Sequence, residues 1–271
     1  MCEEKKKNFV EKLGAQLERG KMTLAQMDDT LKNAGDKLAD YIKAFKGDAR
    51  PGAKKLVDKY QKTMDRLEEE KKRIFKMKEY ERRYAEYEYI AGIDEVGRGP
   101  LAGPVVTCAV ILPKDCDILY INDSKQLTEK KREELYEEIT AKAISYGIGI
   151  SSPQRIDEIN IQQANFEAMR ESIANLSVIP DILLNDAVTI PEVRIPQVPI
   201  IKGDTKSISI AAASIVAKVF RDRLMAEYDK QYPGYSFASN KGYGSEEHIQ
   251  ALKKLGPTPI HRKSFLHNFG Y

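Results

Sequence analysis

Apolar residues recur at two different spacings along the chain, and the change between them falls near residue 89. From residue 8 to residue 45, and again after Pro51, apolar side chains return every three or four positions, which is typical of amphipathic helices. Gly20 and Gly35 interrupt the first stretch, so we expect two or three short helices there and a longer helix after Pro51.

Short apolar runs bounded by glycine and proline make up the rest of the chain. These runs predict strands over residues 89–94, 105–112, 144–150, 181–186 and 199–201. Helical spacing predicts helices over residues 129–143, 161–176 and 207–228, the first of them capped by Thr128. The order β-β-α-β-α-β-β-α indicates an α/β fold in which helices flank a mixed sheet.

The use of proline changes at the same place as the apolar spacing. Only one of the 12 prolines, Pro51, precedes residue 100. We therefore predict a small all-α module over residues 1–86 and an α/β domain over residues 87–271. A chain of 271 residues, with 42% apolar and 31% charged side chains, is long enough to form both.

Hydropathy and cysteine usage exclude several classes of protein. No stretch approaches the roughly 18 consecutive apolar residues of a membrane helix, and the N-terminus lacks the apolar segment of a secretory signal. We therefore expect a cytoplasmic protein without a membrane partner. We also expect a monomer. Three cysteines without C-x-x-C spacing argue against a disulfide framework and against a structural zinc site.

Charge is distributed unevenly between the two predicted regions. Residues 1–88 contain 23 Lys and Arg against 18 Asp and Glu, a net charge of +5, whereas the remainder has 21 against 23. A basic surplus suits contact with a polyanion such as nucleic acid. The alternative is that these charges form solvated helix faces without a specific partner.

Acidic residues follow three of the predicted strands. Asp94 and Glu95 end the first, Asp186 closes the run 182–185, and Asp204 follows the run 200–203. Such a pattern predicts a sheet that delivers carboxylates to one edge, where hard cations would offset their repulsion. Neighbouring residues of a strand point to opposite faces, so Asp94 and Glu95 can serve one site only if the chain turns there.

Ordinary structural roles are alternatives for each of these residues. Asp204 could cap the helix that follows it, and Asp186 could belong to a plain turn. Asp94 and Glu95 are harder to explain in this way, because two carboxylates would be left at a semi-buried strand end. The convergence of all four at strand ends favours a functional site.

Several longer motifs occur in the second region, and they resemble one family. They are residues 89–105 (YIAGIDEVGRGPLAGPV), 122–125 (NDSK), 201–207 (IKGDTKS), 211–218 (AAASIVAK) and 240–244 (NKGYG). In this order, over roughly residues 89–265, they are similar to ribonuclease HII, the type 2 ribonucleases H.

The resemblance implies a ribonuclease H-like fold and a metal-dependent nuclease. It implies that Asp94, Glu95, Asp186 and Asp204 are catalytic and bind Mg²⁺ or Mn²⁺. The expected chemistry is two-metal hydrolysis of a phosphodiester, leaving 5′-phosphate and 3′-hydroxyl ends. The expected substrates are RNA–DNA hybrids and duplex DNA that contains single ribonucleotides, cut on the 5′ side of the ribonucleotide.

The resemblance also implies substrate-binding residues. Gly97, Arg98 and Gly99 would place backbone groups on the 2′-hydroxyl, the group that distinguishes RNA from DNA. Tyr243 would stack on the sugar of the neighbouring deoxynucleotide. The expected phosphate contacts are Asn122, Ser124, Lys125, Lys206 and Arg262.

Three features stand apart from the motifs. Asn185 precedes Asp186 where a buried strand would favour an apolar residue, so we expect a partly solvated strand end. His248, His261 and His267 lack metal-ligand spacing and are expected at the surface. No motif covers residues 1–88, whose charged helices suggest a module that grips or docks the substrate.

Two other functions compete with this hypothesis. Ribonuclease HIII shares the acidic site, but Arg98 between two glycines and a helical N-terminal region favour ribonuclease HII. A non-catalytic nucleic-acid-binding protein is the second alternative, with the four acidic residues serving as caps. The presence of all four at strand ends argues against it.

Overall fold

A computed structural model describes residues 22–270. The chain divides into two compact units between Arg73 and Ile74. The predicted break at Gly20 and any helix before it lie outside the described residues. Within residues 22–270, no helix is long and apolar enough to cross a membrane.

The N-terminal unit is helical, as predicted. Its helices are α2 (Leu24–Lys32), the 3₁₀ turn Gly35–Lys37, α3 (Leu38–Phe45) and the first part of α4 (Pro51–Met77). Thr23 caps α2 in a reciprocal capping box with Gln26. Gly35 separates α2 from α3 with φ of 51°, as expected for a break. The small apolar core contains Met27, Leu31, Ile42, Phe45, Ala53 and Val57.

The second unit is built on a five-stranded mixed sheet with the order β3-β2-β1-β4-β5. The pairs β1–β2 and β2–β3 are antiparallel, whereas β1–β4 and β4–β5 are parallel. The strands are β1 (Ile90–Val96), β2 (Val105–Ile111), β3 (Ser145–Ser151), β4 (Ile182–Asp186) and β5 (Gln197–Ile200).

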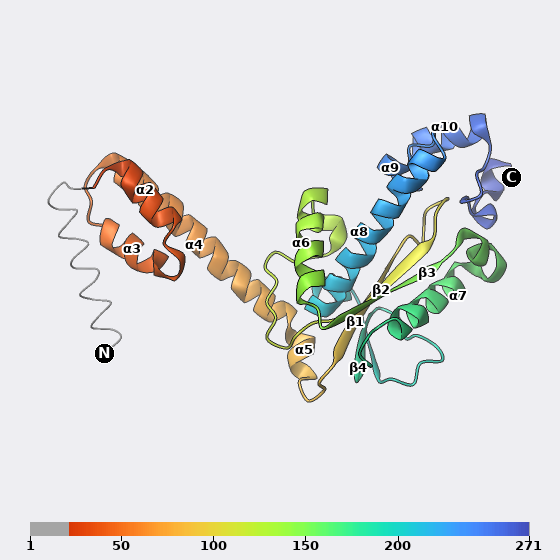
Figure 1. Ribbon diagram of the computed structural model, residues 1–271, viewed down its shortest axis with the longest axis horizontal. Helices are drawn as coiled ribbons and strands as arrows, with labels where there is room; N and C mark the ends of the chain where they lie inside the picture. Colours follow the sequence, from red (N-terminus) through yellow and green to blue (C-terminus); the bar gives the residue numbers. More distant parts are fainter. Residues whose placement is uncertain (1–21, 271) are drawn as a thin grey trace. The chain divides into compact units, whose positions relative to one another are not determined.

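Helices cover both faces of this sheet (Figure 1). The helix α8 (Ile208–Gln231), with α6 (Glu129–Lys142) beside it, packs on one face, and α7 (Pro153–Ala174) packs on the other. Every residue of β2 is buried, because its alternate side chains enter the two apolar cores. A Cβ atom at Gly92 would lie 2.1 Å from the carbonyl carbon of Ser209, so glycine allows β1 to approach α8 closely.

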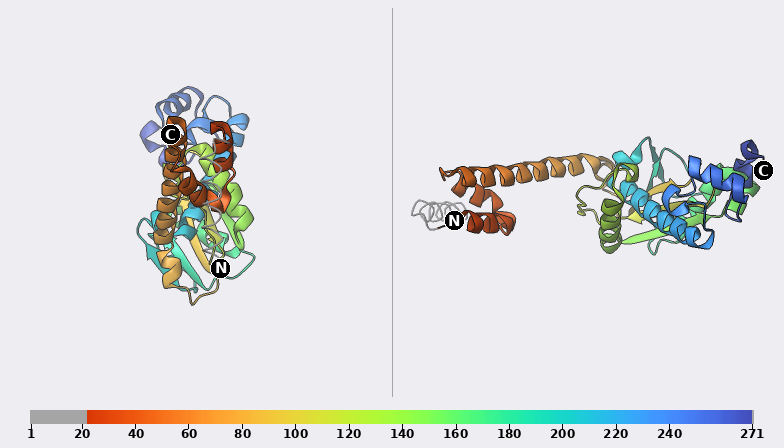
Figure 2. Two further views of the ribbon diagram at one scale, coloured as in Figure 1. Left: turned by 90° about the vertical axis from the view of Figure 1, so that its left-hand side faces the viewer. Right: turned by 90° about the horizontal axis from the view of Figure 1, so that it is seen from above.

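Short elements complete the second unit. Beyond α8 the chain forms α9 (Phe237–Asn240) and α10 (Glu246–Leu255), which lie near the C-terminal end of α8 (Figures 1 and 2). The others are α5 (Glu79–Arg83) and the 3₁₀ turns Ser124–Gln126, Gly203–Thr205, Lys263–Phe265 and His267–Phe269.

The α/β fold class predicted from the sequence is confirmed, with local differences. The predicted helix 161–176 is preceded by a helical segment from Pro153, and Asn160, with φ of 71°, separates the two. Asn160 Oδ1 accepts hydrogen bonds from the backbone of Gln162 and Gln163, so a new helix begins after it, as the spacing indicated. The strand β1 extends two residues further than predicted, to Val96.

Candidate active site

The topology of the sheet brings the four predicted acidic residues to one edge. The parallel strands β1 and β4 end at the same edge, and their register pairs Ile93 with Asn185. Asp94 and Asp186 are therefore the next residues along two neighbouring strands. Asp204 follows β5, the next strand in the sheet. We call Asp94, Glu95, Asp186 and Asp204 the acidic edge.

Asp94 and Glu95 point to opposite faces of the sheet. The carboxylate of Asp94 interacts with Ser214 of α8, whereas that of Glu95 interacts with Asn165 of α7. The chain does not turn at Asp94 and Glu95, since β1 remains a strand through Val96. The two carboxylates therefore lie at the same edge of the sheet but on its two faces.

Burial and mutual repulsion affect these carboxyl groups strongly. Burial raises the pKa of Asp94 well above its usual range, and the charges of Glu95 and Asp186 raise it further. Burial also raises the pKa of Glu95, with Arg98 opposing the shift and Asp186 adding to it. The pKa of Asp204 is raised by burial and then by Asp123 and Asp186. Asp186 therefore influences all three of its neighbours.

The donor chemistry of the acidic edge fits a hard divalent cation. Carboxylate oxygens are the ligands that Mg²⁺ and Mn²⁺ prefer, and a cation would relieve the repulsion. Glu95 Oε2 is buried and has no hydrogen-bond partner, so it remains open to a ligand. However, no three His, Cys, Asp or Glu side chains among residues 22–270 are arranged so that they could hold a metal.

Asp186 and Asp204 are held by a short turn after β5. The backbone N–H of Gly203 donates a hydrogen bond of 2.7 Å to Asp186 Oδ1. Asp204 lies in the 3₁₀ turn Gly203–Thr205, and the residue that caps α8 is Ser207, whose hydroxyl accepts from Ile210 N. The alternative that Asp204 caps this helix is therefore wrong.

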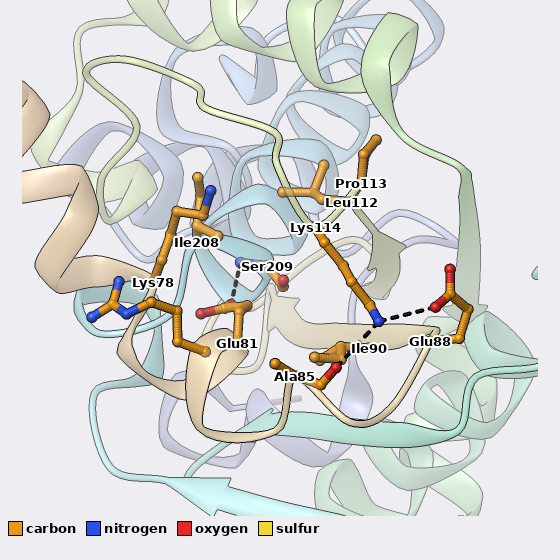
Figure 3. A pocket seen from close by; sticks show the side chains of 11 residues that line it. Lys78, Glu81, Ala85, Glu88, Ile90, Leu112, Pro113, Lys114, Ile208 and Ser209 are labelled. Atoms are coloured by element: carbon orange, nitrogen blue, oxygen red, sulfur yellow. Dashed lines mark hydrogen bonds and ion pairs between the residues drawn. The ribbon is translucent and has the colours of Figure 1, made fainter.

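The carboxylate of Glu81, a residue of α5, stabilises the start of α8. Glu81 Oε1 accepts hydrogen bonds from Ser207 Oγ at 2.5 Å and from Ser209 N at 3.0 Å. Glu81 borders a cavity of about 90 Å³ that is also lined by Ile90, Lys114 and Ile208 (Figure 3). Lys114 pairs there with Glu88 at 2.9 Å. Glu81 thus fixes the helix that directly follows Asp204.

Two fully buried arginines support the segment 97–104, which we call the glycine-arginine loop. Arg221 donates to the carbonyls of Ala102, Pro104 and Lys241 at 2.8–3.1 Å. Arg262 donates to the carbonyls of Gly97, Arg98 and Gly103 at 2.5–2.9 Å.

This arrangement corrects the prediction for Arg262. Its side chain is 0% exposed and its guanidinium is occupied by backbone carbonyls, so it is not a phosphate contact. Burial lowers the pKa of Arg262 to about 9, and the nearby positive charge of Arg221 contributes. Burial likewise lowers the pKa of Arg221 to about 10. Both guanidinium groups hold the backbone of the glycine-arginine loop by hydrogen bonds from the protein interior.

Tyr243 lies next to the glycine-arginine loop. The residue is 44% exposed, and its Cε1 atom would lie 3.9 Å from a Cβ atom at Gly99. The carbonyl of Gly242 accepts hydrogen bonds from the backbone of Leu101 and Ala102 at 2.9 and 3.3 Å. The structure thus brings together Gly97, Arg98, Gly99 and Tyr243, which are far apart in the sequence.

The remaining predicted substrate residues have different surroundings. Lys125 and Lys206 are exposed, and Asn122 Nδ2 donates to Gln126 Oε1 at 3.1 Å. Ser124 is buried, and its hydroxyl lies 3.0 Å from that of Ser214, which contacts Asp94. The Ser124 side chain therefore faces the interior, which contradicts the predicted phosphate contact through its hydroxyl.

Two expectations about exposure were wrong, and a third holds only in part. Asn185 itself is 0% exposed, with its amide donating to Gln197 within the sheet, whereas Asp186 at the strand end is partly exposed. His248 and His261 are buried and lie against each other, whereas His267 is exposed as expected. Sequence spacing could not reveal the two buried histidines, because thirteen positions separate them.

Several residues of the site escaped the sequence analysis. Asp123 influences Asp204 and Ser214 influences Asp94. Both lie within the motifs 122–125 and 211–218, so the motifs could have indicated them as residues of the site. Glu81 and Arg221 lie in no motif, and only their tertiary contacts reveal them.

Comparison with known protein families covers both units of the chain. Residues 91–268 match the family model for ribonuclease HII. Residues 23–85 match the model for the ribonuclease HII N-terminal domain. The helical region, for which the sequence offered no motif, is therefore a recognised part of the same family.

Curated relatives agree with this result. The ribonuclease HII of Lachnoclostridium phytofermentans is 69% identical over 221 residues, which are 82% of this chain and 87% of that protein. The ribonuclease HII of Acetivibrio thermocellus is 49% identical over 253 residues, covering 92% of this chain and 99% of that protein.

A solved structure shares the fold. The ribonuclease H2 of Pyrococcus horikoshii is 28% identical, covers 65% of this chain and 93% of its own, and superimposes with a TM-score of 0.56. Together with the family models, these similarities establish an enzyme of the endonuclease class. The chain belongs to the ribonuclease HII family.

Proposed function

We propose that this enzyme cuts duplex DNA on the 5′ side of single embedded ribonucleotides, and also hydrolyses the RNA of RNA–DNA hybrids. The observation that carries the proposal is the central position of Asp186 in the acidic edge. Its charge raises the pKa values of Asp94, Glu95 and Asp204. This acidic edge adjoins the glycine-arginine loop, which directly follows β1.

In this proposal Asp94, Glu95, Asp186 and Asp204 would turn their carboxylates toward two divalent ions, Mg²⁺ or Mn²⁺, and hold them. When bound, such ions supply an activated water and stabilise the leaving 3′-oxygen, which gives 5′-phosphate and 3′-hydroxyl products. Ser214 orients the carboxylate of Asp94, and Gly203 N–H orients that of Asp186. A side-chain nucleophile is not needed for this chemistry.

In this proposal the glycine-arginine loop and Tyr243 determine selectivity for the ribonucleotide. The backbone at Gly97, Arg98 and Gly99 would contact the 2′-hydroxyl, and Arg262 holds the carbonyls of the first two in place. Tyr243 would pack on the next sugar and leave little room for a second 2′-hydroxyl. Lys125 and Lys206, both exposed, would contact phosphates, as would Asn122.

One assay tests the proposal. The protein is offered three labelled duplexes with Mg²⁺ or Mn²⁺: DNA with one ribonucleotide, an RNA strand on DNA, and plain DNA. We expect cutting of the first two and no cutting of the third. Absence of cutting at the single ribonucleotide would contradict the proposal, and binding of all three without cleavage would favour a non-catalytic nucleic-acid-binding protein.

The role of Tyr243 is tested on the same substrates. Tyr243→Ala should reduce cleavage at the single ribonucleotide by more than cleavage of the continuous RNA strand. The nearest comparable contact, base–aromatic stacking, is worth about 1–3 kcal/mol by alanine substitution, which corresponds to a loss of roughly 5- to 150-fold. Equal losses on the two substrates would mean that Tyr243 positions the duplex without distinguishing the junction.

A further inference from the structure

Two histidines lie buried behind Tyr243. His248 of α10 is 0% exposed and His261 is 3% exposed, and their Nε2 atoms are 3.0 Å apart. The rings of Tyr235 and Phe237 pack around them, with Tyr235 5.3 Å from His261 and Phe237 5.2 Å from His248 between ring centroids. We call His248 and His261 the histidine pair.

The outer hydrogen bonds of the histidine pair determine which nitrogen of each ring carries the proton. His248 Nδ1 lies 2.8 Å from the carbonyl oxygen of Tyr243, which can only accept, so this nitrogen carries a proton. The backbone N–H of Thr258 donates to His261 Nδ1 at 2.9 Å, so this nitrogen does not. A neutral His261 must then be protonated at Nε2 and donate to His248 Nε2.

The resulting arrangement favours neutral rings. A proton added to His248 would enter at Nε2 and face the N–H of His261, whereas a proton added to His261 would enter at Nδ1, where it would face the N–H of Thr258 and find an acceptor in the Thr258 hydroxyl, 2.8 Å away. In agreement, burial lowers the pKa of His261 to about 4, with the neighbouring His248 contributing. Burial also lowers the pKa of His248.

The histidine pair connects the two segments that flank the recognition site. At one end it binds the carbonyl of Tyr243, whose ring lies beside Gly99. At the other end, the backbone of His261 forms a β-bridge with Ala102 of the glycine-arginine loop. The residue after His261 is Arg262, which holds the same loop by its side chain.

We propose that the histidine pair is a positioning device for ribonucleotide recognition: one fixed neutral tautomer of each ring sets the position of Tyr243 relative to Gly97, Arg98 and Gly99. This inference rests on the proposed function and adds His248 and His261 to the residues that determine specificity. They act through Tyr243 and do not touch the substrate.

The tautomers can be measured without any variant. Long-range ¹H–¹⁵N spectra of the full-length protein at neutral pH should show His248 protonated at Nδ1 and His261 protonated at Nε2, both neutral. The exposed His267 provides an internal reference for a freely titrating ring. A doubly protonated ring in the pair, or the opposite tautomers, would overturn the proposal.

The link to specificity is tested with His248→Phe, which keeps the aromatic volume and removes both hydrogen bonds. Cleavage at a single ribonucleotide should fall by about tenfold more than cleavage of a continuous RNA strand, the size expected for one buried hydrogen bond. The matched control is Tyr235→Phe, which packs in the same place and loses the bond from its hydroxyl to the Gly256 carbonyl. This control should leave the ratio between the two substrates unchanged.

A double variant separates positioning from general stability. If His248 acts through Tyr243, His248→Phe should cause no further loss at the single ribonucleotide when Tyr243 is already alanine. Additive losses, or equal losses on both substrates, would overturn the inference. Failure of the proposed function would appear in the wild-type protein, as absence of cutting at the single ribonucleotide, and would remove this inference with it.

Discussion

Two groups of ionisable side chains lie in or around the segment 94–104, and they differ in how completely their hydrogen bonds are satisfied. In the acidic edge, like charges lie close together, carboxyl pKa values are raised and Glu95 Oε2 has no partner. Around the glycine-arginine loop, Arg221 and Arg262 donate to backbone carbonyls, and the histidine pair forms a continuous chain of hydrogen bonds.

The acidic edge therefore has the properties of a reactive site, and the hydrogen-bonded groups around the glycine-arginine loop have those of its structural support. Groups that repel one another destabilise the folded protein, and they are retained where a ligand can use them. Buried polar groups with complete hydrogen bonding make a loop rigid and specify one conformation. Substitutions in the acidic edge should therefore affect activity, and substitutions around the loop should affect stability first.

The strongest test removes one charge from the acidic edge. Asp94→Asn or Asp186→Asn should abolish cleavage, because the site loses a metal ligand, while the fold is kept. Asp94 has a raised pKa in the folded protein, so its destabilising effect is absent at low pH and develops as pH rises above 3.8, the value expected when unfolded. The stability gain of Asp94→Asn over wild type should therefore grow from about pH 4 upward.

Activity and denaturation are measured on the same preparations. Wild-type turnover by either variant at saturating Mg²⁺ would remove the assignment of these residues as metal ligands. A loss of stability in Asp94→Asn at neutral pH, measured without added metal, would contradict the repulsion inferred for the acidic edge.

The next largest effect is expected at Arg262. Arg262→Met should lower the free energy of unfolding by about 3 kcal/mol, because the carbonyls of Gly97, Arg98 and Gly103 lose their buried donors. Arg98→Met is the matched control. Arg98 is exposed and pairs with Glu95 at 3.4 Å, so its substitution should change stability by less than about 1 kcal/mol. Chemical denaturation of both variants gives their free energies of unfolding. Equal free energies would mean that the buried Arg262 does not stabilise the glycine-arginine loop.

A smaller effect is expected at Glu81, which lies outside both groups but fixes the helix next to Asp204. Glu81→Ala should lower stability by about 1 kcal/mol, as for the loss of a helix cap, whereas Glu81→Gln retains an oxygen that accepts from Ser207 and Ser209. Thermal unfolding of the two variants gives the difference. If Gln and Ala behave alike, the charge of Glu81 matters rather than its hydrogen bonds.

The smallest effect concerns the N-terminal unit. A protein that begins at Ile74 should keep its fold and cleavage, but bind substrate more weakly and with a shallower salt dependence, by about 1 in the log–log slope for each lost phosphate contact. An unchanged slope would mean that the charged helices do not grip nucleic acid.

The predicted domain boundary between residues 86 and 87 can be tested in the same series. Ile74 and Met77 are buried in the core of the second unit, and Glu81 contacts α8. A protein that begins at Glu86 should therefore be less stable than one that begins at Ile74. Equal stability of the two proteins would support the boundary predicted from the sequence.

Much of the fold could be predicted because local patterns determine it. The runs 105–112 and 181–186 became β2 and β4, since continuous apolar residues between turn signals suit strands buried on both faces. The helix after Thr128 began where the cap indicated. The segment from Pro153 to Asn160 was missed, because it is a single short helical stretch before a break that Asn160 creates by its own side chain.

The sequence by itself determined which elements form and which acidic residues end up at one edge, because strand periodicity and the order of strands are local properties. Only the tertiary structure decided that Asp94 and Glu95 approach this edge from opposite faces, that Arg262 points inward and that His248 meets His261. These features depend on contacts between segments far apart in the chain. A polar side chain can be solvated or buried according to whether such contacts satisfy its hydrogen bonds, and no local pattern records that outcome.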